Sequence, residues 1–296
     1  MVDDTALGEF LRSRRGGLKP EDVGITSYGA RRVPGLRREE LAQLAGVSAT
    51  YYTRLEQGQS NRASESVIEA LARALALSQD ERAYLHNLAR PTIAKPPKPA
   101  KPAKARLSTR QLIEAVSEIP AVVIGMRNEV LAWNTLGHLL LGGHLDADAP
   151  NRPAERPNLV RMLFLDQHHR DLYPRWEDAA GCAVASLRLM VSRHRDDRGL
   201  AELIGELTMK SAEFASLWST HPVANHTSGK RHLRHPEVGE LQLELETMHL
   251  SDEPDHRILM YSATPGSSSH AALQLLRSKL DSVRQPDWSV AARSRP

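Results

Sequence analysis

A stretch rich in proline and lysine, Pro91–Arg106 (PTIAKPPKPAKPAKAR), most constrains how this chain can fold. Proline recurs there too often for a helix, and the stretch has almost no apolar side chains to bury. It is therefore predicted to be an extended, semi-rigid linker. The chain then consists of an N-terminal domain at residues 1–90, the linker at 91–106, a larger domain at 107–285 and a tail at 286–296.

The composition is that of a folded, water-soluble protein, with 41% hydrophobic and 25% charged residues. No apolar run approaches the roughly 18 residues that cross a bilayer, and the N-terminus lacks the apolar core of a secretory signal. The single cysteine, Cys182, excludes an intramolecular disulfide and a thiolate zinc cluster. We therefore expect a cytoplasmic protein with no membrane partner.

Basic residues are concentrated toward the N-terminal end. Residues 1–90 carry a net charge of +1, residues 91–106 carry +5 and residues 107–296 carry −3. A basic N-terminal part followed by a mildly acidic C-terminal part indicates that the N-terminal part binds a polyanion such as a nucleic acid. Charge alone leaves open the alternative of an ordinary solvated surface.

The fold class indicated by the apolar spacing is mixed. The N-terminal domain is predicted to be all-α with five helices, at 5–15, 37–45, 49–57, from Ser64 or Ser66 onward, and at 80–89. The C-terminal domain is predicted to be α+β with an antiparallel sheet. Its helices are expected at 109–118, 134–141, 176–192 and 200–218, its hairpin at 121–125 and 129–133, and its later strands at KRHLRH, GELQLELETMHL and RILMYSA.

Within the second of these later strands, Gly239–Leu250, apolar and polar residues alternate cleanly. Successive side chains of a strand point to opposite faces of the sheet. The leucines at 241, 243 and 245 therefore share one face, and the polar residues between them share the other. This pattern predicts a sheet with one buried face.

The stretch Arg38–Gln57 (REELAQLAGVSATYYTRLEQ) carries the clearest functional signal. Two short helices that cross closely need a small residue at the contact, which is Ala42. The turn between them needs a residue that tolerates positive φ, which is Gly46. Apolar residues that fill the gap between the helices are Val47, Tyr52 and Leu55. An ordinary helical hairpin is the alternative.

This stretch resembles the helix-turn-helix of the XRE (phage-repressor-like) family, and the ending LEQG at Leu55–Gly58 fits the same pattern. The resemblance implies that the second helix of the motif enters the major groove of double-stranded DNA with its first residues at base edges. Tyr52 and Leu55 face the core and are excluded from this role. The DNA-contacting positions of the helix and its cap are then Ser48, Ala49, Thr50, Tyr51, Thr53 and Arg54, with Tyr51 on a phosphate or sugar.

The resemblance also assigns roles to arginines around this helix. Arg54 is expected to make a bidentate contact with guanine, with a surface ion pair as the alternative. Arg37 and Arg38 are expected to lie on phosphates, where they position the protein without reading sequence. Readers of this kind usually bind two-fold sites, so a homodimer is expected.

Two features of the N-terminal domain stay open. Glu56 is expected to form an internal ion pair with either Arg14 or Arg15, and the sequence does not say which. The loop 18–36 is longer than the usual connection of the family. It carries Arg31 and Arg32, which either reach DNA or belong to a solvated loop.

The insertion and the C-terminal half resemble the MmyB-like branch of this family. The matching motifs occur in order over nearly all of residues 107–280: LAWN (Leu131–Asn134), NLVR (Asn158–Arg161), Trp176, SAEFASLW (Ser211–Trp218), the run His235–Gly239 and YSATPGS (Tyr261–Ser267). The resemblance implies a PAS-like domain, in which a curved antiparallel sheet and its helices close over a small hydrophobic effector. Fatty acids are the leading candidates.

A fatty acid needs an apolar tunnel and one cationic, hydrogen-bonding end. Arg161, with Asn158 one turn away, is expected to hold the carboxylate. The alternatives are that Asn158 caps a helix and that Arg161 forms a buried ion pair. The expected tunnel residues, each of which is otherwise a core residue, are Val122, Ile124, Trp133, Met162, Phe164, Phe214, Trp218, Leu243, Leu259 and Tyr261.

Catalysis and metal binding find little support in the sequence. The histidines show no converging ligand set, no nucleophile or phosphate-binding motif is present, and Cys182 lies in an apolar helical run. We expect a transcription regulator that is not an enzyme and has no cofactor other than a bound fatty acid. The competing functions are a dimerisation or protein-interaction module and, less favoured, an enzyme fused to a DNA-binding domain.

Overall fold

The computed structural model describes residues 6–25, 35–59, 63–89, 103–223 and 228–284. Most of the expected linker (residues 91–102), Arg31 and Arg32 of the long loop, and the expected tail at 286–296 lie outside the described residues. The chain forms two compact units. A helical unit comprises Met1–Lys98 and Gly181–Asn225, and a sheet unit comprises Pro99–Ala180 and His226–Pro296.

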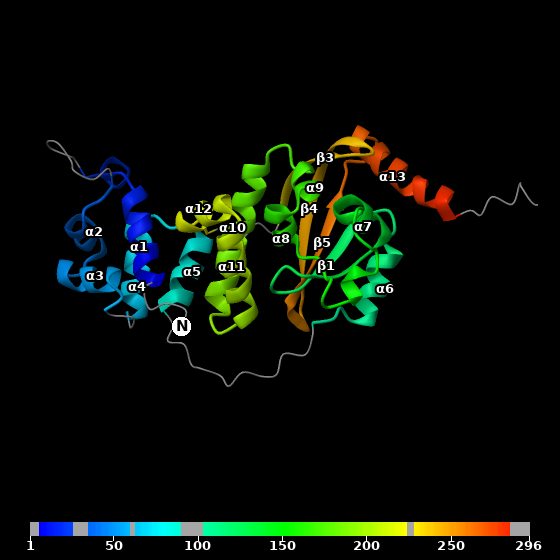
Figure 1. Cartoon of the computed structure of the whole chain (residues 1–296). Coiled ribbons are helices and arrows are strands. Elements are labelled where there is room, and N and C mark those ends of the chain that lie inside the picture. The colour runs from blue at the N-terminus through cyan, green and yellow to red at the C-terminus, as the bar shows by residue number, and fades with distance from the viewer. Residues whose placement is uncertain (1–5, 26–34, 60–62, 90–102, 224–227, 285–296) are drawn as a thin grey trace, which may run out of the picture. The chain divides into compact units, whose positions relative to one another are not determined.

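The N-terminal part of the helical unit has the expected helices (Figure 1). They are α1 (Ala6–Gly17), α2 (Arg38–Ala45), α3 (Ala49–Glu56), α4 (Glu65–Ala74) and α5 (Gln79–Ala89), with a short 3-10 turn at Pro20–Val23. Their apolar faces form one core around Phe10, Tyr52 and Leu71. The predicted all-helical N-terminal region is confirmed.

Local chemistry sets the ends of the two motif helices. Gly46 ends α2 with φ of 67°, a left-handed conformation that glycine adopts without strain. Ser48 begins α3, because its hydroxyl accepts a hydrogen bond from the Tyr51 N–H at 3.1 Å. Gly8 of α1 lies so close to the end of α3 that an added Cβ would meet the Glu56 carbonyl oxygen at 2.2 Å. A glycine is therefore required at the crossing of α1 and α3.

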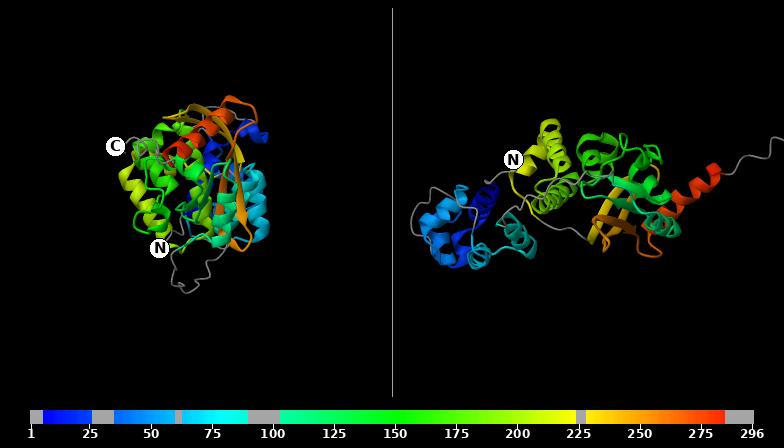
Figure 2. Two further views of the ribbon diagram at one scale, coloured as in Figure 1. Left: turned by 90° about the vertical axis from the view of Figure 1, so that its right-hand side faces the viewer. Right: turned by 90° about the horizontal axis from the view of Figure 1, so that it is seen from below.

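The sheet unit is built on five antiparallel strands in the order β2-β1-β5-β4-β3. The strands are β1 (Ala121–Ile124), β2 (Val130–Trp133), β3 (Ser228–His235), β4 (Gly239–Leu250) and β5 (Glu253–Ser262). The two views of Figure 2 show β3, β4 and β5 side by side. The α+β class with an antiparallel sheet is confirmed, as is the single buried face of β4, on which alternate leucines are buried.

Each face of the sheet has its own apolar core, so the prediction of a sheet with one buried face is right for β4 but wrong for β1, which is buried on both faces. One face, called the inner face below, carries Val122, Leu243 and Tyr261 and packs against α7 (Thr135–Gly142) and α13 (Ser268–Arg284). The other face carries Val123 and Ile258 and packs against α6 (Leu107–Ala115). The remaining helices of the unit that precede β3 are a 3-10 turn at Ala149–Asn151, α8 (Leu159–Leu165) and α9 (Gln167–Asp171).

The region before β3 differs from the sequence-based expectation. The run at 200–218 was expected to be one helix, but Ser211 has extended backbone and divides it into α11 (Arg198–Lys210) and α12 (Ala212–Ser219). The Ser211 hydroxyl caps α12 by accepting from the Phe214 N–H, and capping of this kind favours a new helix start. The division at Ala180 falls within α10 (Trp176–Arg193).

Residues 181–223 pack with the N-terminal helices, although the sequence placed them in the C-terminal domain. Leu189 and Val223 are buried in the core that also contains Phe10 and Tyr84. Arg195 donates from Nη2 to the Asn87 carbonyl at 2.5 Å. The helical unit therefore contains a second layer, made of most of α10 together with α11 and α12.

Candidate functional site

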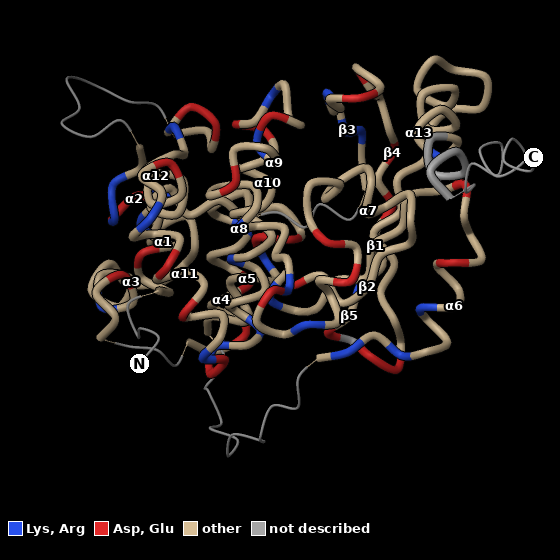
Figure 3. Tube along the Cα trace, turned by 45° about the vertical axis from the view of Figure 1, so that its right-hand side comes forward, with Lys and Arg blue, Asp and Glu red and all other residues tan. Residues whose placement is uncertain are grey.

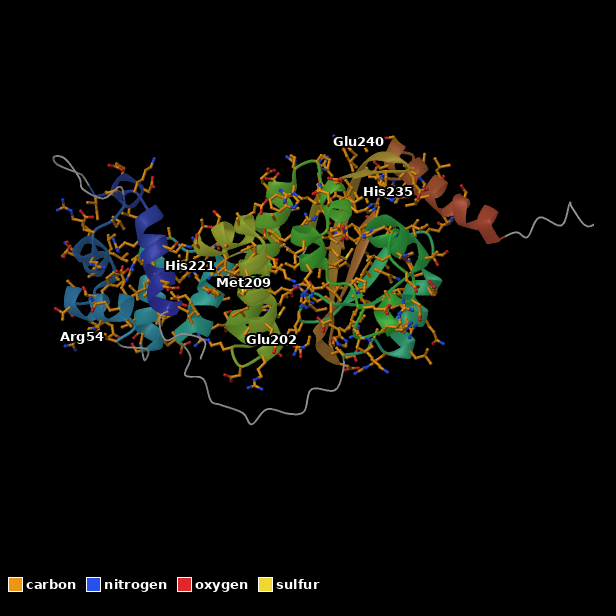
Figure 4. All side chains as sticks on the ribbon, viewed as in Figure 1. Arg54, Glu202, Met209, His221, His235 and Glu240 are labelled. Atoms are coloured by element: carbon orange, nitrogen blue, oxygen red, sulfur yellow. The ribbon has the colours of Figure 1, made fainter. Side chains whose placement is uncertain are left out.

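The helix α3 and its cap present a mixed set of side chains. Ser48, Thr50 and Arg54 are exposed, and Ala49 and Tyr51 are half-buried. Figure 4 shows Arg54 at the outer surface of the helix. No hydrogen bond or ion pair of the Arg54 side chain is found among the described residues, so the surface ion pair proposed as its alternative is not present there.

Thr53, also expected to contact DNA, is half-buried and already engaged. Its hydroxyl donates to the Ala49 carbonyl oxygen one turn back, at 2.8 Å. Tyr52 and Leu55 are fully buried, in accord with their exclusion from base contacts. The exposed positions of α3 are thus a subset of those that the sequence singled out.

Glu56, at the end of α3, is the centre of a buried ionic network. Only 3% of the residue is exposed. Arg15 donates from Nε to Oε1 at 2.6 Å, Arg38 donates from Nε to Oε2 at 2.7 Å, and the Tyr52 hydroxyl donates to Oε1 at 2.7 Å. We call these four residues the Glu56 cluster. The open choice between Arg14 and Arg15 is settled in favour of Arg15, because Arg14 pairs with Glu81 instead.

The electrostatics of the Glu56 cluster agree with this geometry. Burial alone would raise the pKa of Glu56, but hydrogen bonds from Arg15, Tyr52 and Arg38 outweigh it and hold the pKa below its usual value. Burial and the adjacent carboxylate both raise the pKa of Tyr52, so its hydroxyl stays a donor. A buried carboxylate that accepts hydrogen bonds from three side chains has its charge and its hydrogen-bonding capacity compensated within the protein. Glu56 is therefore interpreted as a structural residue.

The two arginines expected on phosphates differ in their surroundings. Arg37 is exposed at the N-terminus of α2, where its backbone N–H donates to Glu40 Oε2 at 2.6 Å. Arg38 belongs to the Glu56 cluster, and its side chain is 40% exposed. Figure 3 shows basic segments on α1 and α2 interleaved with acidic ones. Only part of the basic charge here is therefore free of internal pairing.

The second layer of the helical unit is joined to α1 by polar contacts. The Arg14 side chain donates from Nη2 to the His221 carbonyl oxygen at 2.7 Å, and Ser13 donates to the Thr220 carbonyl at 3.4 Å. Arg188, which is buried, lies with its guanidinium carbon 4.0 Å from the centre of the Trp218 ring and donates to the Trp218 carbonyl.

His221 is the polar centre of this contact (Figure 4). Its Nδ1 lies 3.0 Å from Arg188 Nη1 and accepts from it, which requires the neutral ring. Burial, and then the positive charges of Arg188 and Arg14, lower the pKa of His221 to about 4. The sequence left the role of this histidine open, and the long separation from Arg14 gave no signal for the contact.

Some of the expected ligand residues do come together in the sheet unit. Val122, Ile124, Leu243, Leu259 and Tyr261 all lie in the inner-face core. Trp133 packs against the same core, and its indole N–H donates to the Ala147 carbonyl at 2.7 Å.

The Trp133 ring also lines a pocket of about 100 Å³, together with Arg110, Glu114 and Pro150. Ligand pockets typically measure roughly 300–1,000 Å³. This pocket is therefore too small for an acyl chain.

Other expected ligand residues lie elsewhere. Phe164 is buried on α8 and packs edge-to-face on Trp176, with ring centres 5.4 Å apart; Met162 is buried on the same helix. Phe214 and Trp218 belong to the helical unit, where their rings stack on each other at 5.6 Å. These two aromatic residues pack within a different unit from the inner-face core.

Asn158 and Arg161, the two residues expected to hold the carboxylate of the ligand, have different surroundings from those expected. Asn158 is buried and caps α8: its side-chain oxygen accepts from the Val160 and Arg161 N–H groups, each at 3.1 Å. Its side-chain amide donates to the Arg127 carbonyl at 2.7 Å. Arg161 is exposed. The capping alternative for Asn158 is thus observed, whereas Arg161 is not the buried ion-pair partner that was its alternative.

Two polar residues of the inner face, Arg231 and Tyr173, were not predicted from the sequence. Arg231 on β3 and Tyr173 after α9 lie near Tyr261, and the sequence singled out only Tyr261 of the three. The signal for Arg231 was present, since Arg231, Leu233 and His235 alternate along the strand and share one face. Tyr173 lies in a loop and carried no periodic signal.

The described parts of the chain hold neither a metal-ligand cluster nor a membrane-spanning helix. There, no group of three or more His, Cys, Asp or Glu side chains is placed to hold a metal ion. No helix in those parts is both long and apolar enough to cross a membrane.

Comparison with known proteins places both halves of the chain. Residues 6–85 match the family model of a helix-turn-helix domain. Residues 105–276 match the model of the MmyB-like transcription regulator ligand binding domain. No curated protein matches the chain significantly. The matched DNA-binding and ligand-binding domains are those of a ligand-responsive transcription regulator, and the chain belongs to the MmyB-like family of such regulators.

Proposed function

We propose that this regulator reads a specific DNA site with the N-terminal part of α3 and responds to an acyl carboxylate bound in its sheet unit. The observation that carries the DNA-reading part is the surface of α3. Ser48, Thr50 and Arg54 are exposed on a helix that Tyr52 and Leu55 hold in the core. The N-terminal residues of a recognition helix contact base edges in the major groove.

Within this proposal, Arg54 reads a guanine and Arg37 contacts a phosphate. Ala49, Thr50 and Thr53 lie near base edges, with Tyr51 and Arg38 toward the backbone. A guanidinium that binds guanine O6 and N7 discriminates against other bases by about 1–3 kcal/mol. An arginine on a phosphate adds affinity for every sequence alike.

The test compares Arg54→Ala with Arg37→Ala on two DNA duplexes, one selected in vitro with the wild-type protein and one random. We expect Arg54→Ala to weaken binding to the selected duplex only. We expect Arg37→Ala to weaken both and to reduce the salt dependence of binding by about one unit. Equal losses on both duplexes for Arg54→Ala would make Arg54 a backbone contact and would contradict its role as a reader.

The aliphatic composition of the inner face supports the proposal that the effector has an acyl chain. Strands β1, β4 and β5 contribute aliphatic side chains there, and α7 and α13 cover them. Each buried methylene adds about 0.8 kcal/mol to binding. Calorimetric titration with carboxylates of increasing chain length therefore tests this part, and affinity independent of chain length would contradict it. Absence of binding at every length would instead favour an interaction module.

We further propose that α10, α11 and α12 transmit the effect of ligand binding in the sheet unit to the DNA-binding helices. Residues 181–223 match the ligand-binding family model, yet they pack with α1 and α5. Arg14→Gln replaces the guanidinium that donates to the His221 carbonyl and pairs with Glu81 by a shorter, neutral amide, and it should reduce the effect of dodecanoate on DNA affinity. Arg12→Gln, at an exposed position of α1, is the matched control. An unchanged response in Arg14→Gln would exclude this contact from the pathway.

The proposed assembly is a homodimer on two half-sites. One helix-turn-helix per chain reads one half-site, and two-fold operators match two-fold proteins. Light scattering of the protein–DNA complex should give two chains per selected duplex. One chain per duplex would contradict the dimer.

A further inference from the structure

Arg231 lies on the inner face of the sheet, opposite a leucine of β4. Along β3, Leu233 and His235 are buried, and Arg231 shares their face because side chains alternate. It pairs in register with Leu243 of β4, which belongs to the inner-face core. A cationic side chain is therefore directed toward the same core that the proposed acyl ligand uses.

Two tyrosines flank this arginine. Tyr261 of β5 pairs with Leu245, one inner-face position along β4 from Leu243. Tyr173 is held beside β3 because the Arg234 N–H donates to the Leu172 carbonyl at 2.8 Å. Its ring packs against the inner-face core and meets His169 edge-to-face, with ring centres 5.4 Å apart. We call Arg231, Tyr173 and Tyr261 the Arg231 cluster.

The polar groups of this cluster have almost no partners of their own. Among the described residues, neither phenol hydroxyl makes a hydrogen bond, and the only bond of the Arg231 side chain is from Nη1 to the carbonyl of its neighbour Lys230, at 3.1 Å. No carboxylate pairs with Arg231 in the same part of the chain. Tyr261 is buried, whereas Arg231 and Tyr173 are half-buried, so the donor groups of the cluster are available to a ligand at the edge of the inner-face core.

The chemistry of the set identifies the missing partner. Burial raises the pKa of Tyr173 to about 12, against a smaller opposing effect of the Arg231 charge, and burial also raises the pKa of Tyr261. Both phenols are therefore donors at neutral pH. A guanidinium fork and two hydroxyl donors suit a planar anion with two oxygens, and the surrounding leucines suit an apolar tail.

We propose that Arg231, Tyr173 and Tyr261 form the anionic-head subsite of the effector site and bind the carboxylate of an acyl ligand. This assignment rests on the proposed acyl response and moves the head group from Arg161, which is exposed, to the inner face of the sheet. Arg231 supplies the charge, and the two phenols supply the directed hydrogen bonds to the carboxylate oxygens.

The test measures binding of dodecanoate, below its micellar concentration, and of dodecanol to the full-length chain. Arg231→Gln should weaken dodecanoate binding at least about 30-fold, because it removes the guanidinium that pairs with the carboxylate. Dodecanol binding should change less than about threefold, since the alcohol lacks the anion. Tyr173→Phe and Tyr261→Phe should each weaken dodecanoate binding about tenfold while keeping the ring in place.

Two arginines serve as controls. Arg234 lies on the opposite face of the same strand and pairs with Glu240 at 2.8 Å, so Arg234→Gln should bind dodecanoate as the wild type does. Arg161→Gln should also leave binding unchanged. Thermal melts without ligand, unchanged for each variant, show that a loss of binding is not a loss of folding.

The outcomes separate this inference from the proposed function. If the wild type binds dodecanoate and Arg231→Gln binds it equally well, the inference is overturned and the acyl response stands. The same holds if Arg161→Gln alone loses binding, or if dodecanoate and dodecanol lose affinity together in Arg231→Gln. If the wild type binds no acyl carboxylate, the proposed effector is wrong, and this subsite falls with it.

Discussion

The helical unit and the sheet unit each bring arginine and tyrosine side chains together, and the two clusters differ in what the arginines pair with. In the helical unit, Arg15, Arg38 and Tyr52 all donate to Glu56. In the sheet unit, Arg231, Tyr173 and Tyr261 converge without any acidic side chain among the described residues. The residue types are nearly the same, and the difference is one carboxylate.

This difference separates a structural role from a binding role. A buried ion that the chain itself neutralises stabilises one conformation, and removing its centre leaves uncompensated charge. A cation and two donors without a partner are instead poised for a carboxylate from outside, at some expense in stability. The Glu56 cluster holds α1, α2 and α3 together, whereas the Arg231 cluster is expected to gain its partner with the ligand.

The largest expected effect tests the structural half of the comparison. Glu56→Gln leaves Arg15 and Arg38 without their buried counter-charge and should lower the free energy of unfolding of the helical unit by about 3–5 kcal/mol. This loss of free energy is measured by chemical denaturation of the full-length chain, monitored by hydrogen exchange in peptides from α3. A loss below about 1 kcal/mol would show that the Glu56 cluster is not needed for stability.

A second prediction concerns acid. Burial lowers the pKa of His169 to about 4, and its Nδ1–H donates to the Leu141 carbonyl at 2.9 Å. The unfolded histidine titrates near 6.5, so the folded state binds fewer protons between about 6.5 and 4. The stability that His169 contributes is full above pH 6.5 and is lost as the pH falls toward 4, by roughly 3 kcal/mol in total.

His169→Asn is the matched variant, because the asparagine amide retains a donor near the Leu141 carbonyl and does not titrate. Denaturation of the sheet unit at a series of pH values should show a flatter pH dependence between 6.5 and 4 in this variant. The same slope in both proteins would exclude His169 as the titrating group. Glu56 acts in a lower window, because its lowered pKa places its loss of stability below about 4.3.

The smallest expected effects distinguish two neighbouring arginines. Arg38→Gln removes one of three donors to Glu56 from a partly exposed side chain, so it should lower stability by about 1 kcal/mol. Arg37→Gln should leave stability unchanged and reduce only DNA binding. Melting temperatures and DNA affinities of the two variants check this. Equal melting temperatures would show that the Arg38–Glu56 pair contributes nothing measurable.

Sequence alone predicted what depends on local periodicity. The spacing of Ala42 and Gly46 predicted the crossing of α2 and α3, and the alternating leucines of β4 predicted its buried face. Family resemblance correctly indicated both domains. The boundary inside 200–218 was missed, because a serine within an apolar run looks like an ordinary helix position until its backbone is seen.

What could not be predicted depends on contacts between distant segments. Arg15 and Arg14 are adjacent, and only the fold decides that one meets Glu56 and the other meets Glu81. Arg231 and Tyr173 are separated in sequence by α10, α11 and α12. The NLVR motif drew attention to Arg161, but the cap formed by Asn158 uses the backbone N–H of that arginine and leaves its side chain exposed.

The most direct test of the contrast between the two clusters is the thermal melting of Arg231→Gln with and without dodecanoate, beside the wild type. The account predicts that the ligand-free variant melts at or slightly above the wild-type temperature, because among the described residues the substitution breaks no ion pair and only the hydrogen bond from Arg231 to the Lys230 carbonyl. It also predicts that dodecanoate raises the melting temperature of the wild type and not that of the variant. A ligand-free variant that melts well below the wild type, or one that keeps the full dodecanoate shift, would contradict the assignment of this cluster to the ligand.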